Sequence, residues 1–303
     1  YCYMSTQKSL IDDPQKAKRR MSSILAEAFI GKKLGWKIGA LSAGYGSYTQ
    51  ESLLELCKNV VEVTKEKVWL NVGVLPEPTI QLLEPYLEGI FGAVETINPE
   101  VHKQVAPNKP IAPIERMYKV CDKYNLKKAM TFIVGMGESI DDFALLEDFI
   151  KKHKLDKVIF YALNPIKGTV FEKSAGPSIH YYLEWMQKTR QSFPDIEIVA
   201  GPWVSRVGHI HDMLAAGATS FTKFPAIKLF NSEHAKKIEQ EIKKAGFEFT
   251  STFTKLFEFD KEEILALDLE ESLKVELVEH VFRYWQKMKN PKTKNTLIEV
   301  EEF

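Results

Sequence analysis

Hydrophobic side chains recur along this chain in two alternating patterns. In some segments they are spaced three and four residues apart, which predicts amphipathic helices, and in others they form short unbroken runs, which predict buried strands. The expected helices cover residues 16–34, 49–64, 77–87, 114–124, 140–153, 180–192, 208–215 and 233–244. The expected strands cover residues 36–41, 68–72, 89–94, 129–134, 157–163, 196–200 and 220–224. Seven strands that are each followed by a helix indicate parallel pairing.

The regular alternation favours a closed barrel over a doubly wound open sheet, because no hinge or change of composition interrupts the series. A TIM-type barrel has about eight βα units, so we expect one strand before Tyr1, outside the sequence. The predicted fold class is therefore α/β, a TIM-type (β/α) barrel of parallel strands with its first strand missing from the sequence shown. Its chemistry is expected at the carboxyl ends of the strands.

The pattern changes after residue 246. Residues 247–259 are polar and aromatic, and a helical segment rich in leucine and valine follows. Charged residues interrupt the apolar stripe between Leu273 and Val281, which favours packing against protein over contact with a membrane. We expect a barrel domain over residues 1–246 and a C-terminal helical extension over residues 247–303, packed on the barrel or on a partner.

Composition narrows the classes of partner. The chain of 303 residues carries 41 basic and 41 acidic side chains and has a pI near 7.2, so it has no general attraction to nucleic acid or to an anionic membrane. Three widely spaced cysteines do not suit a disulfide framework and fit a reducing cytoplasm. Cys57 and Cys121 fall in amphipathic helical patterns and are expected to pack in the core.

The chain begins with Tyr1, Cys2 and Tyr3, with neither an initiator methionine nor a secretory leader. An iron–sulfur motif of the form C-x-x-x-C-x-Y-C would end in this way. The fragment alone is a weak signal, because a cysteine is often only a small buried hydrophobe. It indicates that more protein precedes Tyr1, and it makes Cys2 a candidate metal ligand that needs support from the rest of the chain.

Glycine recurs where the expected strands end. One such glycine serves only to turn a loop, but several on one predicted face favour a ligand site, because a missing side chain lets the backbone approach a ligand closely. Tyr45, Tyr48 and Trp203 lie at the same ends and are expected either to line a substrate pocket or to pack in the core. The segments that follow the strands are 42–46, 71–73, 95–96, 135–138, 164–169, 201–206 and 223–225.

Several of these stretches resemble a known family. They are similar, in order and spacing, to the barrel of biotin synthase and lipoyl synthase, members of the radical S-adenosylmethionine (SAM) superfamily, and the resemblance extends to about residue 230. The stretches are 68–73, 95–96, 132–139 and 164–169. The resemblance implies that Cys2 is the third thiolate of a [4Fe–4S] cluster whose open iron chelates SAM. Reduction of the cluster then splits SAM into methionine and a 5′-deoxyadenosyl radical.

The resemblance also implies where SAM binds. Tyr1 is the aromatic residue before the last cysteine, whose neighbourhood contacts adenine. Ser42, Ala43 and Gly44 stand in the place of a Gly-Gly-Glu stretch that binds the methionine amino group. Because the carboxylate of that stretch is absent here, backbone carbonyls are expected to serve.

Further contacts with SAM are implied at two other strand ends. Glu95 is placed to accept hydrogen bonds from SAM, and Lys109 falls where related enzymes put a cation for the methionine carboxylate, with Arg116 as a neighbouring alternative. The residues whose backbone would flank adenine are Val134, Gly135, Met136 and Gly137. The implied cofactor site therefore spans several loops.

Residues 200–209 resemble the lipoyl-synthase stretch Gly-Pro-Leu-Val-Arg-Ser-Ser followed by Tyr-His, in which a serine binds an auxiliary [4Fe–4S] cluster that is consumed as the sulfur source. Ser205 and Arg206 are thus the expected catalytic residues, although they reverse the family's order. In the structural alternative, Ser205 caps a helix that begins near Gly208 and Arg206 pairs with a surface carboxylate.

The nearby His209 and His211 lie on opposite faces of the expected helix. They cannot chelate a metal jointly with i,i+4 geometry, so we expect a cap and a surface group.

The activity that the resemblance implies is sulfur insertion at an unactivated C–H bond of an octanoyl chain on a lipoyl-domain lysine or its peptide, by a subunit of the two-protein lipoyl synthase of archaea. The implied partners are that lipoyl-domain protein or octanoyl peptide, a second radical SAM subunit and an electron donor such as ferredoxin. Another biotin-synthase-like enzyme (biotin synthase, isomerase or maturase) and a cluster-free barrel that binds a partner are the alternatives. A phosphate-binding barrel is a third, for which residues 216–218 are a poor candidate.

Overall fold

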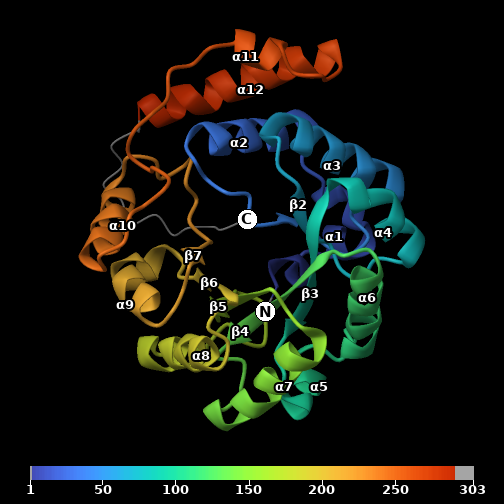
Figure 1. Cartoon of the computed structure of the whole chain (residues 1–303), viewed down its shortest axis with the longest axis vertical. Coiled ribbons are helices and arrows are strands. Elements are labelled where there is room, and N and C mark those ends of the chain that lie inside the picture. The colour runs from blue at the N-terminus through green and yellow to red at the C-terminus, as the bar shows by residue number, and fades with distance from the viewer. Residues whose placement is uncertain (1, 291–303) are drawn as a thin grey trace.

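The computed structural model describes residues 2–290 and has an α/β fold in which a curled parallel sheet is surrounded by helices (Figure 1). Its seven strands pair in parallel and in sequence order. They are β1 (Leu41–Ser42), β2 (Val68–Asn71), β3 (Leu87–Glu95), β4 (Lys127–Val134), β5 (Lys157–Ala162), β6 (Glu197–Gly201) and β7 (Ser220–Phe221). Within residues 2–290 no pairing joins β7 to β1, so the barrel-like sheet is open on that side. The predicted α/β class and parallel order are confirmed.

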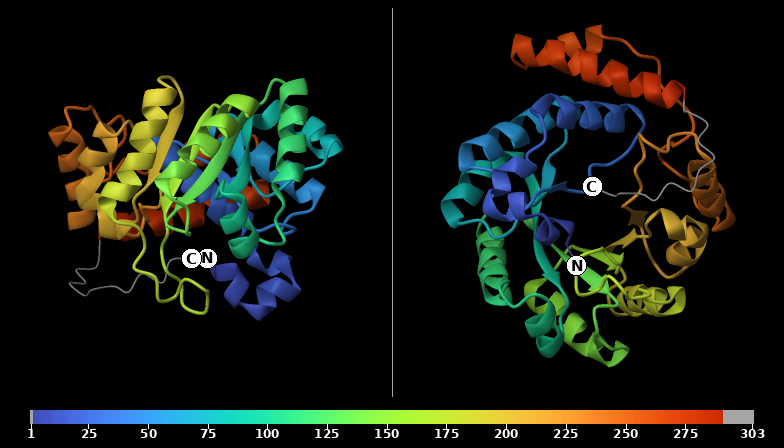
Figure 2. Two further views of the ribbon diagram at one scale, coloured as in Figure 1. Left: turned by 90° about the horizontal axis from the view of Figure 1, so that it is seen from below. Right: turned by 180° about the vertical axis from the view of Figure 1, so that it is seen from behind.

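The helices lie outside the sheet, and the view from behind shows them as a ring around it (Figure 2, right). They are α1 (Lys8–Asp12), α2 (Met21–Lys33), α3 (Gln50–Thr64), α4 (Glu77–Leu83), α5 (Pro99–Val105), α6 (Ile111–Lys123), α7 (Phe143–His153), α8 (Ile179–Ser192), α9 (Ile210–Ala215), α10 (Glu233–Lys244), α11 (Glu262–Leu265) and α12 (Glu271–Lys289). The 3-10 turns are η1 (Tyr3–Thr6), η2 (Pro14–Ala17), η3 (Glu84–Tyr86), η4 (Ile140–Asp142) and η5 (Val204–His209).

The first and last strands are shorter than predicted. Residues 36–41 contribute only the start of β1, because the Trp36 indole donates to the Thr252 carbonyl (2.7 Å) and its backbone N–H donates to the Gly31 carbonyl (2.8 Å). Of residues 220–224, only Ser220 and Phe221 form β7. Lys223 has a φ of +64°, a left-handed conformation that ends the extended chain.

Two predicted helices differ most from their observed bounds. The helix expected over residues 16–34 begins at Met21, because Lys18 and Arg20 are extended. The helix expected over residues 77–87 ends at Leu83, after which Pro85 belongs to a single 3-10 turn that leads directly into β3.

Bulky side chains fill the lumen of the sheet. Trp69, Phe91, Ala129, Ile159 and Val199 form one buried layer. The ammonium of Lys157, at the start of β5, lies 4.0 Å from the centroid of the Trp69 ring. This packing closes the amino-terminal part of the lumen and leaves the carboxyl ends of the strands to carry polar groups.

Cys57 and Cys121 are buried in the outer core, as predicted. Burial raises the pKa of each thiol to about 12, which keeps both thiols protonated near neutral pH and unsuited to metal binding.

The segment after residue 246 packs against α2 (Figure 1). Leu277 and Val281 of α12 are fully buried in the same core as Leu25 of α2, and the hydroxyls of Ser23 and Tyr284 lie 2.9 Å apart. The division of the chain into domains at residue 246 stays a prediction. Among residues 2–290, none of the helices combines the length and apolar character that a membrane span requires.

Candidate functional site

The segment that contains Cys2 lies at the carboxyl ends of the strands. In η1, Met4 packs against Gly44 after β1 so closely that a Cβ at Gly44 would lie 2.4 Å from its terminal methyl carbon. Thr6 packs against Gly168 in the loop after β5, and a Cβ there would lie 3.3 Å from its methyl carbon. Figure 2 (left) shows α1 and this loop at the same end of the barrel. Cys2 is exposed there, while Tyr1 lies outside the described residues.

An iron–sulfur cluster needs more ligands than the described residues supply. Within residues 2–290, Cys2 is the exposed thiol, and no group of three or more histidine, cysteine, aspartate or glutamate side chains has a metal-binding arrangement. The accessible position of Cys2 beside the strand ends fits one thiolate of a [4Fe–4S] cluster. Its role as a ligand stays a prediction.

The turn after β1 uses one of the carbonyls that the resemblance assigned to SAM. The Ala43 N–H donates to the Asn71 carbonyl (3.1 Å), and the Gly44 carbonyl accepts from the Ser47 N–H (3.1 Å). Backbone carbonyls of Ser42 and Ala43 are therefore better candidates than that of Gly44. The hydroxyl of Ser47 is buried and has no partner among the described residues, a feature that the sequence pattern did not single out.

Glu95 and Lys109 are brought together although they are 14 residues apart. The Lys109 ammonium donates to Glu95 Oε1 (2.7 Å), and the Thr131 hydroxyl donates to Glu95 Oε2 (3.1 Å). Glu95 is the last residue of β3 and has a φ of +69°, which is unusual for a residue with a side chain. The two residues predicted to contact SAM thus form one ion pair, in which the carboxylate is buried and the ammonium is partly exposed.

Two buried polar groups after Glu95 were not singled out from the sequence. The Thr96 hydroxyl and His102 Nε2 have no hydrogen-bond partner among the described residues. Burial, assisted by the positive charge of Lys109, lowers the pKa of His102. Because buried polar atoms are normally satisfied, these two atoms mark the β3–α5 connection as a place where a ligand or ordered water is expected.

The loop after β4 is held by its own glutamate. Glu138 accepts the backbone N–H groups of Gly135 (2.5 Å) and Met136 (2.8 Å), and the Val134 carbonyl accepts from the Leu163 N–H (2.9 Å). Burial raises the pKa of Glu138, opposed by these backbone donors. The expectation that the backbone of residues 134–137 contacts adenine stays a prediction, and the Gly135 and Met136 N–H groups and the Val134 carbonyl already have partners within the protein.

Neither structural alternative for Ser205 and Arg206 is correct. The residue before α9 is His209 and η5 begins after Trp203, so Ser205, which is exposed, caps neither element. Arg206 is half-buried and donates to the Pro177 carbonyl (2.7 Å) instead of a carboxylate, and burial lowers its pKa. A catalytic role for either residue stays a prediction.

The three aromatic residues at the strand ends separate into two places. Tyr45 and Tyr48 line a pocket of about 250 Å³ between the ends of β1 and β2. Trp203 lies elsewhere, because its indole donates to the Ala162 carbonyl at the end of β5 (2.9 Å).

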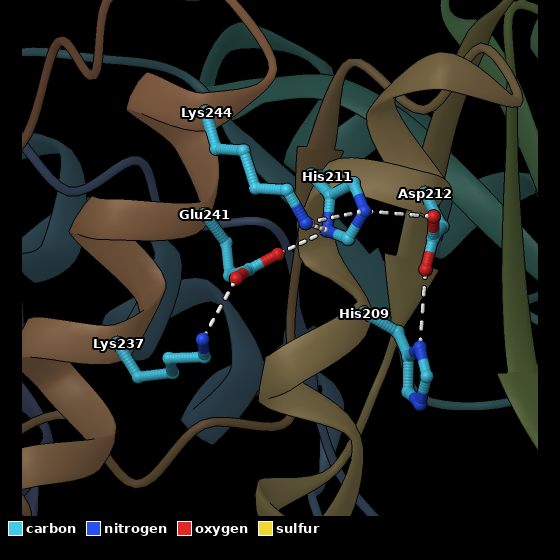
Figure 3. Close-up of polar contacts among 6 residues, drawn as sticks. All are labelled: His209, His211, Asp212, Lys237, Glu241 and Lys244. Carbon is cyan, nitrogen blue, oxygen red and sulfur yellow. Dashed lines mark hydrogen bonds and ion pairs between the residues drawn. The ribbon is translucent and has the colours of Figure 1, made fainter.

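The two histidines near α9 share a carboxylate (Figure 3). Asp212 lies 3.0 Å from His209 Nδ1 and 2.9 Å from His211 Nε2, and His211 Nδ1 also contacts Glu241 of α10. Lys237 completes the network with an ion pair to Glu241 (2.9 Å). The prediction of a capping histidine is wrong, since the His209 side chain makes no cap hydrogen bond, and the network instead connects α9 to α10.

Comparison with solved structures shows what class of fold this is. Methylornithine synthase (PylB) superposes with a TM-score of 0.58 at 17% identity, covering 67% of this chain and 60% of its own. HydG, a maturase of the [FeFe]-hydrogenase, gives a TM-score of 0.57 at 10% identity, covering 67% and 49%. These likenesses concern the fold. Together with the curated relatives described next, they point to the radical SAM superfamily.

The chain belongs to the same family as the uncharacterized protein MJ0597 of Methanocaldococcus jannaschii, with 38% identity over 254 residues, which cover 84% of this chain and 70% of that protein. MJ0785 of the same organism is 29% identical over 55% of this chain and 45% of its own length. The ribosomal protein uS12 methylthiotransferase RimO of Cronobacter sakazakii is 29% identical over 41% of this chain and 30% of its own length. No family model matches the chain.

Proposed function

We propose that this chain is the catalytic barrel of a radical SAM enzyme that inserts sulfur into an unactivated C–H bond. The observation that carries the proposal is the placement of exposed Cys2 by η1 against Gly44, at the same end of the sheet as Glu95 and Lys109. Cys2 would hold the cluster together with thiolates from outside the described residues. The cluster and SAM would supply the 5′-deoxyadenosyl radical.

In this proposal the chain's own residues bind SAM and hold it in position. The carbonyls of Ser42 and Ala43 would accept hydrogen bonds from the methionine ammonium of SAM. The Glu95–Lys109 pair offers both a carboxylate and an ammonium within 2.7 Å, so it matches a ligand that carries donors next to an anionic group. The packed lumen layer below would exclude water from the reacting carbon.

The proposed substrate is an octanoyl chain on a lipoyl-domain lysine, as in lipoyl synthesis, with an auxiliary [4Fe–4S] cluster as the sulfur source. Its support is the resemblance of residues 200–209 to lipoyl synthases and the likeness of 41% of the chain to RimO, whose name describes a sulfur-transferring enzyme. A second radical SAM subunit and a small iron–sulfur electron donor such as ferredoxin are the proposed partners.

The proposal is tested with protein purified anaerobically as its gene encodes it. The protein is mixed with dithionite, SAM and a lysyl peptide carrying an octanoyl group, with and without a second radical SAM subunit. We expect 5′-deoxyadenosine and a thiolated peptide, both detected by mass spectrometry, and a loss of both products in Cys2→Ala. Cys57→Ala is the matched control and keeps activity, because that thiol is buried and protonated.

The outcomes test separately whether the protein is a radical SAM enzyme and whether an octanoyl chain is its substrate. 5′-Deoxyadenosine without thiolated peptide would reject the octanoyl substrate and keep the radical enzyme. Absence of both products from a protein without iron would favour the cluster-free barrel that binds a partner.

A further inference from the structure

The lumen of the sheet has a second level above its buried layer. Side chains alternate between the two faces of a strand, so the residues two positions after those of the buried layer also face the lumen. They form what we call the floor of the barrel mouth. The floor residues are Asn71 on β2, Ala93 on β3, Thr131 on β4, Tyr161 on β5 and Gly201 on β6.

The floor is open toward the carboxyl ends of the strands. Asn71, Ala93 and Tyr161 are partly exposed, whereas the residues directly before and after each of them in its strand are buried. The buried layer lies between these three residues and the amino ends of the strands. Their exposed surface therefore faces the mouth, where Glu95 and Lys109 form their ion pair.

Two floor side chains carry hydrogen-bonding groups that the protein does not use. Within residues 2–290, neither the side-chain amide of Asn71 nor the hydroxyl of Tyr161 has a hydrogen-bond partner. The Thr131 hydroxyl, by contrast, donates to Glu95 (3.1 Å). Polar groups inside a barrel are normally paired, so these two groups mark a place for a polar ligand. All five floor residues are uncharged, which favours a neutral ligand group.

Tyr161 is held in place and stays protonated. Its ring packs on the buried layer and against Gly201, where the ring leaves no room for a side chain. Burial, and then the negative charge of Glu95, raises the pKa of Tyr161. The floor thus offers a fixed hydroxyl donor at neutral pH.

We propose that Asn71 and Tyr161 form a subsite for a neutral amide group of the substrate. The carbonyl of such an amide would accept from the Tyr161 hydroxyl, and its N–H would donate to the side-chain carbonyl of Asn71. A carboxylate fits less well, because it has no N–H for Asn71, meets no cation on the floor and is repelled by Glu95.

In the proposed function this group is the amide that joins the octanoyl chain to the lysine. The inference rests on that function for the identity of the substrate. Ala93 provides apolar surface beside the two polar groups for the carbons next to the amide. Amide binding itself requires no radical chemistry, so it can be measured separately.

The test uses the protein as its gene encodes it, without reductant or SAM. The probes are N-methylhexanamide and hexanoate, which share an acyl chain and differ in charge. Saturation-transfer nuclear magnetic resonance on the probe gives its dissociation constant. We expect saturable binding of N-methylhexanamide and about tenfold weaker binding of hexanoate, or less. Intact amide binding together with a failed thiolation assay would reject the sulfur insertion and keep the subsite.

Variants of the floor identify the groups that bind. Tyr161→Phe and Asn71→Leu should each weaken binding of N-methylhexanamide about tenfold. Both should unfold thermally as the wild type does, because neither removes a hydrogen bond within residues 2–290. Tyr86→Phe, before β3, and Asn59→Leu, in α3, are the matched controls and should bind like the wild type.

Three results would overturn the proposal. They are equal binding of the two probes, wild-type amide binding by both floor variants, and no saturable binding of N-methylhexanamide at millimolar concentration. A fourth result would assign the floor to the adenine of SAM instead. In that case adenosine binds, the two floor variants weaken its binding, and N-methylhexanamide does not compete with it.

Discussion

At the scale of single residues, the most consequential feature is the Glu95–Lys109 pair. Its carboxylate accepts both the Lys109 ammonium and the Thr131 hydroxyl, in a setting where only 11% of the Glu95 side chain is exposed. The residue types were found from a family resemblance, but their mutual contact was not. Lys109 follows α5, a helix that the sequence pattern did not predict, so its direction toward Glu95 could not be deduced.

Removing the cation from this pair should destabilise the fold. Lys109→Gln leaves a buried carboxylate without its positive partner, so we expect the free energy of unfolding to fall by about 1–3 kcal/mol in urea titrations. Lys103→Gln, at an exposed lysine of α5, should leave the free energy of unfolding unchanged. Effects of Lys109→Gln and Glu95→Gln that simply add up in the double variant would contradict the coupling between the two residues.

Glu138 has a comparable structural role in the loop after β4. Glu138→Ala would leave the Gly135 and Met136 N–H groups without their acceptor and should cost about 1–3 kcal/mol of unfolding free energy. Glu138→Gln retains one acceptor oxygen, so its unfolding free energy should lie between those of the wild type and Glu138→Ala. If Glu138→Ala behaves like Asp141→Ala, at an exposed acidic residue of the same connection, the loop is not held by this carboxylate.

At the scale of elements, the helix–strand series was predictable because amphipathic helices and apolar strands repeat strongly. The errors fall where long-range contacts decide the backbone. Trp36 leaves the expected first strand because Thr252, far along the chain, accepts its indole N–H. The helix α5 was missed although Asn98 followed by Pro99 is a typical helix start, since the short segment carries little apolar periodicity.

The cap of α5 is testable on its own. The Asn98 side chain accepts the N–H groups of Glu100 (2.9 Å) and Val101 (3.1 Å) and donates to Asp142 (2.8 Å). Asn98→Ala should therefore lower the unfolding free energy by about 1–2 kcal/mol, while Asn98→Ser, which can still cap, should lose less. Identical thermal unfolding of the two variants would show that the cap is unimportant.

At the scale of the whole molecule, the parallel sheet, the placement of η1 and the docking of α12 on α2 define one connected structure. The sequence predicted the sheet and the end that carries the glycine turns, because both follow from local patterns. It could not predict the packing of Met4 on Gly44, since this contact joins segments that are distant in sequence.

Stability of the whole fold should depend on pH through two buried histidines. Burial lowers the pKa of both His102 and His153 from the ordinary value of 6.5. The unfolded chain therefore binds protons more readily, so the free energy of unfolding should fall as the pH drops through about 6.5 and below. Urea titrations at several pH values should show this loss, and the double variant His102→Gln with His153→Gln should show less of it. An unchanged pH dependence in that variant would contradict the assignment.

The central claim is that Cys2 is a cluster ligand at the carboxyl end of this sheet, and electron paramagnetic resonance tests it most directly. The protein is purified anaerobically as its gene encodes it and is reduced with dithionite. The account predicts a [4Fe–4S]⁺ signal that changes when SAM is added and that is lost in Cys2→Ala while Cys57→Ala retains it. A signal that survives Cys2→Ala with an unchanged response to SAM would contradict the account.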